Sequence, residues 1–95
     1  MQKTLYTQQY RALLALLRHA RLQAGLNQQE LAERLQWTQV NVSKCETGVR
    51  RLDVIELKLW VQALGWSLPG FLTELQSRTD LAELPERGPS VGAPR

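Results

Sequence analysis

Residues 27–48, NQQELAERLQWTQVNVSKCETG, carry the signals of two short helices with room for only a tight turn between them. Asn27 can cap the first helix through its side-chain oxygen, and Glu30, three residues on, can accept a hydrogen bond from the Asn27 N–H. Thr38 can cap the second helix, and Gly48 suits the left-handed position that follows a helix C-terminus. The segment therefore predicts a helix, a tight turn and a second helix.

The two predicted helices differ in what their outer faces carry. Leu31, Ala32 and Leu35 share one face of the first at helical spacing. On the second, Val42 and Cys45 point towards a core, and the opposite side holds Gln39, Val40, Ser43 and Lys44. A Gln near a helix N-terminus and a Lys one turn later can bond base edges and phosphates in the major groove of DNA. A merely solvated face would have the same polarity, so this spacing alone leaves both interpretations open.

The combination of motifs resembles a known family. Residues 25–32 (GLNQQELA), 38–39 (TQ) and 42–48 (VSKCETG) are similar to the Xre-type helix-turn-helix of phage repressors, Cro proteins and many bacterial regulators. Residues 50–57 (RRLDVIEL) resemble a bacterial subgroup, and the resemblance covers about residues 13–75. It implies an all-α, compact five-helix bundle of the lambda-repressor-like DNA-binding type, whose second and third helices form the helix-turn-helix. It also implies sequence-specific binding of double-stranded DNA and regulation of transcription, as a small repressor.

The resemblance assigns roles to single residues. Gln28 matches the glutamine that grips a backbone phosphate and steadies the next helix. The positions that contact bases are Gln39, Val40 and Lys44. The residues expected on the sugar–phosphate backbone, besides Gln28, are Thr38, Asn41, Ser43, Arg50 and Arg51. Arg21 and Glu46 match a partly buried salt bridge that ties the first helix to the recognition helix in relatives.

The turn departs from the family pattern at two residues. Gln36 stands where most relatives have glycine, so either it accepts the left-handed conformation at a cost of about 1 kcal/mol or the turn differs. Trp37 follows, where relatives carry a small apolar or a basic residue. We expect its ring to fill the gap between the helices; the alternative is an indole N–H that donates to a DNA phosphate.

Charge is distributed unevenly along the chain. Residues 1–52 contain eight Lys and Arg against three acids, a net of +5, whereas residues 53–95 contain four against six, a net of −2. The basic half holds the motif, which favours a polyanionic partner. The cations expected near the phosphate path are Arg18, Arg34, Lys44, Arg50 and Arg51.

The rest of the chain predicts three further helices and no sheet. A first helix is expected from about Thr7 to Ala24, with an apolar stripe formed by Tyr10, Leu13, Leu17, Ala20 and Ala24. Asp53 and Glu56 form a second possible capping box, for a helix that ends near Leu64. A final helix, with Pro69 in its first turn, would carry Phe71, Leu72 and Leu75.

Composition changes at about residue 77. We expect residues 1–76 to form one helix-turn-helix domain, which is long enough for a small core. Residues 77–95 are rich in proline and glycine and almost without large apolar residues, so a disordered tail is expected there.

Several functions are not expected. No apolar run approaches the roughly 20 residues that span a bilayer, and the polar start lacks the pattern of a signal peptide, so a cytoplasmic location without membrane contact is expected. A single cysteine excludes an internal disulfide, and His19 with Cys45 offers no metal-ligand spacing. No nucleophile, base and orienting acid can be nominated together, so we expect neither catalysis nor a cofactor or metal.

Surplus apolar residues leave two interpretations open: packing under neighbouring segments, which is the commoner one, or contact with a protein partner. Leu14 and Leu16 flank the core stripe of the first helix, and Ile55 and Leu59 lie off the expected core face of the fourth. We expect a homodimer, assembled through the fourth or fifth helix, because two linked half-sites raise affinity for DNA. The alternative is an antitoxin or adaptor that binds a partner protein such as a toxin and regulates its own synthesis through the same motif.

Overall fold

Five helices make up the computed structural model of the protein, which describes residues 3–79. They are α1 (Lys3–Gln23), α2 (Gln28–Leu35), α3 (Gln39–Glu46), α4 (Val54–Ala63) and α5 (Leu68–Thr79). Residues 3–79 contain no strand, so the predicted all-α fold of five helices is confirmed.

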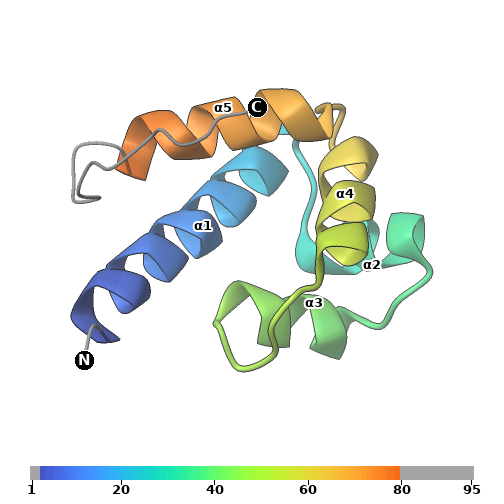
Figure 1. Ribbon diagram of the computed structural model, residues 1–95. Helices are drawn as coiled ribbons and strands as arrows, with labels where there is room; N and C mark the ends of the chain where they lie inside the picture. The colour runs from blue at the N-terminus through green and yellow to red at the C-terminus, as the bar shows by residue number, and fades with distance from the viewer. Residues whose placement is uncertain (1–2, 80–95) are drawn as a thin grey trace.

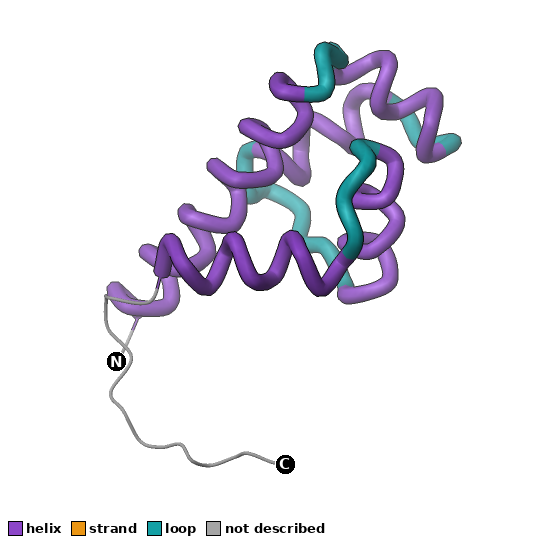
Figure 2. The backbone as a smooth tube through the Cα atoms, turned by 90° about the horizontal axis from the view of Figure 1, so that it is seen from above, coloured by secondary structure: helices purple, strands orange, loops and turns teal. Residues whose placement is uncertain are grey.

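The helices pack around a single core. Figure 1 shows α1 beneath α5, with α2, α3 and α4 gathered to the right of α1. The long α1 packs against α5 on one flank and against α3 on another, whereas α4 contacts both α2 and α5. The most extensive contact is between α2 and α3, which follow one another in the chain. Figure 2, turned by 90°, shows α1 and α5 as the two long rods of the bundle, with the shorter helices grouped at one end.

Two capping boxes set the starts of α2 and α4. Asn27 Oδ1 accepts from the Glu30 N–H at 2.8 Å, and Glu30 Oε1 accepts from the Asn27 N–H at 2.9 Å. The same exchange joins Asp53 and Glu56, at 2.8 and 3.0 Å. Both predicted boxes are confirmed. Each one provides acceptors for two backbone N–H groups that would otherwise lack a partner at the start of the helix.

In the turn between α2 and α3, Gln36 accepts the left-handed conformation, the first of the two possibilities considered above. Gln36 lies in the left-handed region at φ 61°, and its N–H caps α2 by donating to the Ala32 and Glu33 carbonyls. Trp37 then packs on the core, with its ring centroid 6.1 Å from that of Trp60 at an interplanar angle of 78°. The predicted gap-filling position of Trp37 is confirmed.

The core is built from fully buried residues of all five helices: Leu16, Leu17, Leu31, Ala32, Val42, Cys45, Trp60, Val61 and Phe71. Leu16, which flanks the predicted core stripe of α1, is fully buried in this core, so it packs under neighbouring helices and is not available to a partner. Ala24, expected at the end of the same stripe, is exposed in the turn that follows α1. Burial on both flanks of α1 follows from its two helical neighbours.

Helix ends differ from expectation at two places. Helix α1 begins at Lys3 rather than near Thr7, and α5 continues to Thr79, so residues 77–79 are helical rather than part of a tail. The prediction for the remainder of the tail falls on residues 80–95, which lie outside the described residues. Within the described part of the chain, no helix is long and apolar enough to cross a membrane.

Candidate nucleic-acid interface

Helix α3 presents one buried face and one exposed face. Val42 and Cys45 are fully buried against the core. Gln39, Val40 and Lys44 are exposed, and Val40 keeps 56% of its surface in contact with solvent. An exposed valine on a short helix contributes nothing to the core, so its side chain is available to a partner.

Three more candidate residues lie along the same helix. Thr38 caps α3, because its Oγ1 accepts from the Asn41 N–H at 3.1 Å. Asn41 and Ser43 are half-buried, and the Ser43 carbonyl accepts from the Thr47 hydroxyl at 3.0 Å. The cap fixes the start of α3 and leaves the Thr38 hydroxyl proton able to donate to an acceptor outside the protein.

A buried ion pair ties α1 to α3. Arg21 Nε lies 2.6 Å from Glu46 Oε2, and Arg21 Nη2 donates to Glu46 Oε1 at 3.0 Å. Both residues are buried, with 5% and 8% of their surface exposed. Arg21 Nη1 also donates to the Leu26 carbonyl at 2.8 Å, which holds the chain just before α2. The bidentate geometry fixes the direction of α3 relative to α1.

Gln28 extends this ion pair to the exposed surface. Its Nε2 donates to Glu46 Oε1 at 3.0 Å, and its Oε1 accepts from Gln39 Nε2 at 2.6 Å. A carboxylate can only accept, so the bond to Glu46 fixes which way the Gln28 amide points. The polar framework, defined as Arg21, Glu46, Gln28 and Gln39, therefore runs without interruption from α1 to the first residue of α3.

A second ion pair anchors the segment after α3. Arg50 Nη2 lies 2.7 Å from Glu56 Oε2, and Arg50 Nη1 lies 3.3 Å from Cys45 Sγ. The Arg50 guanidinium also lies over the Trp37 ring, 5.3 Å from its centroid. The hydrogen bond from Arg50, followed by that from the Asp53 backbone, lowers the pKa of Glu56. The hydrogen bond to Glu56 in turn raises the pKa of Arg50.

The comparisons with known proteins agree with this geometry. The sequence profile of a helix-turn-helix domain family matches residues 12–69. The chain belongs to the Xre-type helix-turn-helix family. A solved structure titled "XRE-family like protein from Pseudomonas syringae pv. tomato str. DC3000" is 44% identical, with a TM-score of 0.76. The alignment covers 81% of this chain and 94% of that one. No curated protein matches the chain.

Membership of the Xre-type family identifies the chain as a DNA-binding regulator in which α2 and α3 form the helix-turn-helix. The second helix of such a motif, here α3, is termed the recognition helix. The structure brings Gln28, Gln39 and Glu46 into one hydrogen-bonded group with Arg21. It leaves Lys44 exposed on the same side of α3 as Val40.

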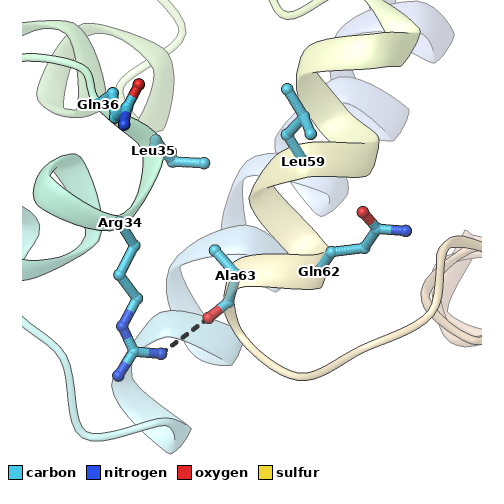
Figure 3. A pocket seen from close by; sticks show the side chains of 6 residues that line it. All are labelled: Arg34, Leu35, Gln36, Leu59, Gln62 and Ala63. Carbon is cyan, nitrogen blue, oxygen red and sulfur yellow. Dashed lines mark hydrogen bonds between the residues drawn. The ribbon is translucent and has the colours of Figure 1, made fainter.

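Arg34 and Arg50, both expected near the phosphate path, are engaged within the protein. Arg34 reaches from α2 to the end of α4, where its Nη1 donates to the Ala63 carbonyl at 2.9 Å (Figure 3). A cation at this place stabilises the C-terminal end of α4. Arg50 is held by Glu56, so phosphate binding would have to share its guanidinium with that carboxylate.

An open hollow of about 400 Å³ lies between α2 and α4, beside Arg34. Figure 3 shows Leu59 and Gln62 of α4 across from Leu35 and Gln36. Among the described residues, no group of three or more His, Cys, Asp or Glu is placed to hold a metal ion.

Sequence reasoning missed three contacts around the recognition helix. They are Arg34 with Ala63, Arg50 with Glu56, and Arg51, whose Cζ lies 4.5 Å from the centroid of the Tyr10 ring. Each joins residues from different segments at no helical spacing, so the sequence carried no signal for them. Asp53 and Glu56 were predicted as a cap, but the second partner of Glu56 was not.

Proposed function

We propose that the protein binds double-stranded DNA at specific sequences through α3 and represses transcription by occluding promoters. The observation that carries this proposal is the polar framework. A buried ion pair continues through Gln28 to Gln39, so the first residue of the exposed face is held in place before any ligand arrives. Such preorganisation lowers the entropic cost of forming directional contacts.

The exposed face of α3 offers three kinds of base contact. The Gln39 side chain carries both a donor and an acceptor, which matches adenine N7 and N6 in the major groove. Val40 can make apolar contact with a thymine methyl group, and Lys44 can donate to guanine or to a phosphate. Three neighbouring chemistries would together specify a short half-site.

The backbone contacts in this proposal surround those base contacts. Gln28 and Thr38 lie at the starts of α2 and α3, and Asn41 and Ser43 lie beside the base-contacting residues. Arg51 follows α3, with Arg50 anchored to Glu56 beside it. These residues would set the position and direction of the protein on DNA rather than its sequence preference.

We propose that the protein acts as a homodimer joined through α4. Ile55 and Leu59 are 59% and 48% exposed, one turn apart on α4, and Leu59 borders the hollow beside Arg34. Burial of two such side chains favours association, and a dimer can place two recognition helices one turn of DNA apart.

Selection of binding sites from random DNA duplexes tests the function directly. The proposal expects enrichment of an inverted repeat with half-sites about 10 base pairs apart, and a complex whose mass corresponds to two chains. A reporter gene with the selected site over its promoter should then lose expression. Selection without an enriched motif would contradict the sequence-specific function.

A second candidate function, an antitoxin or adaptor, is favoured by the same exposed residues on α4. If Ile55 and Leu59 served a different protein, the chain would stay monomeric on its own. A product of an adjacent gene would then bind it and protect these residues from solvent. Sedimentation of the chain alone separates the two candidates.

A further inference from the structure

Helix α1 contains no acidic residue over its full length. The segment KTLYTQQYRALLALLRHARLQ includes four Lys and Arg and one His. Arg21 is used by Glu46, whereas Arg11 and Arg18 are exposed and make no ion pair or hydrogen bond within the described residues. A solvated helix face usually mixes both signs of charge, so an acid-free face favours a polyanionic partner.

The two exposed arginines lie on the flank of α1 that borders α3. This flank is fixed by two contacts: Arg21 binds Glu46, and Leu14 Cδ1 lies 3.0 Å from where a Cβ on Gly48 would be. Arg18 is one turn after Leu14, and Arg11 is three residues before it, so both neighbour Leu14 on the helix surface. Seven residues of helix separate the two arginines by about 10 Å along the axis.

A third guanidinium joins this flank from the segment after α3. Arg51 lies over the Tyr10 ring of α1, with 4.5 Å between Cζ and the ring centroid. A cation over a ring uses the face of the guanidinium, whereas phosphate binding uses N–H groups at its edge, so the two are compatible. In Figure 1 the N-terminal end of α1 and helix α3 lie on the same side of the molecule, away from α5.

We propose that Arg11, Arg18 and Arg51, together called the α1 ridge, form a second row of contacts to DNA phosphates beside the recognition helix. The proposal rests on the proposed DNA binding and extends its footprint along the backbone. The contacts of the α1 ridge would add affinity without adding sequence preference.

The test compares the salt dependence of DNA binding among single and double charge variants of the full chain. Each phosphate contact contributes about 0.9 to the slope of log K against log salt. R11Q and R18Q should each lower the magnitude of that slope by about 0.9, and the double variant by about twice as much. The affinity loss should be equal on selected and random duplexes, and the selected motif should not change.

A matched control removes one exposed cation elsewhere. Lys58 on α4 is exposed and makes no ion pair within residues 7–79, so K58Q changes net charge as R11Q does. If the double variant of R11Q and R18Q keeps its fold by circular dichroism and still shows the same salt slope as K58Q, the proposal that the α1 ridge contacts phosphates is overturned. The proposed function would survive that result if the unaltered chain still selected a motif. An unaltered chain that bound no duplex would overturn both.

Tyr10 acts as a positioning residue for Arg51 in this scheme. Tyr10→Phe keeps the ring under the guanidinium and should leave the salt slope unchanged. Tyr10→Leu removes the ring and should lower the slope by as much as Arg51→Gln does. A double variant with Tyr10→Leu and Arg51→Gln should then be no worse than Arg51→Gln alone, and additive losses would contradict the positioning role.

Discussion

Two ion pairs hold the recognition helix and the segment that follows it, and they differ in burial. The Arg21 and Glu46 side chains are 6% and 3% exposed, whereas those of Arg50 and Glu56 are 37% and 24% exposed. The first pair leads through Gln28 to the exposed face of α3, and the second fixes a connecting segment against Trp37. Removing one partner of a buried pair leaves a charge that water cannot solvate, so burial decides how much each pair matters.

Loss of Arg21 should have the largest effect. Arg21→Ala leaves the Glu46 carboxylate buried with only Gln28 as partner, and should lower the free energy of unfolding by about 3 to 5 kcal/mol. Urea denaturation followed by circular dichroism measures the change. The exposed pair of Arg78 and Glu74 supplies the control, because Arg78→Ala should cost at most about 0.5 kcal/mol. Similar losses for both variants would show that burial does not distinguish the pairs.

Loss of Gln28 should separate stability from recognition. Gln28→Ala removes the link between Glu46 and Gln39 and should lower the free energy of unfolding by only about 1 kcal/mol. Discrimination at the base that we propose Gln39 contacts should fall by about 1 to 3 kcal/mol. Binding to duplexes altered at one position at a time measures this preference.

The neighbouring glutamine gives a matched control for that experiment. Gln29 is exposed and donates only to Glu33, at 3.3 Å on the same helix. Gln29→Ala should leave both stability and base preference close to those of the unaltered chain. Equal loss of preference in the two variants would contradict the role of the polar framework.

A change at the turn tests whether the framework or the turn sets the angle of α3. Gln36 adopts φ 61° with an exposed side chain, so Gln36→Gly should relieve strain and raise the free energy of unfolding by about 0.5 to 1 kcal/mol. Base preference should not change, because the framework still positions Gln39. A thermal melt and a repeated site selection check both expectations, and an altered motif would assign the angle to the turn.

The smallest effect should appear in the pH dependence of the stability that the pair of Arg50 and Glu56 contributes. The pKa of Glu56 in the folded protein is below its ordinary value of 4.5, so its contribution is complete above that pH. As pH falls through the lower folded value, the carboxylate takes up a proton and the contribution is lost. The melting temperature of the unaltered chain should therefore exceed that of Glu56→Gln at neutral pH, and the gap should close in acid. A gap that widened in acid would contradict the assignment.

Whether a contact could be predicted from the sequence depends on how far apart its two residues lie along the chain. Caps such as Asn27 with Glu30 depend on three-residue spacing, so the pattern alone located the starts of α2 and α4. The link from Arg34 to the Ala63 carbonyl spans 29 positions and depends on how α2 packs against α4. Helical spacing describes one helix at a time, so it could not show that Leu16 of α1 is fully buried in the shared core.

The same limit applies within the candidate interface. The exposed face of α3 could be predicted, because burial of Val42 and Cys45 leaves the opposite residues outside. The pairing of Arg50 with Glu56 could not, since it depends on a turn of the chain between α3 and α4. A count of basic residues therefore overestimates the number of cations available to DNA.

Chemical modification of Cys45 can measure how often the recognition helix detaches from the core. It is the only cysteine of the chain, and it is fully buried on the inner face of α3. A thiol reagent can reach its Sγ only when α3 leaves the core, so the modification rate reports the frequency of that opening. Variants that weaken the polar framework should react faster, and bound DNA should slow the reaction in proportion to its affinity.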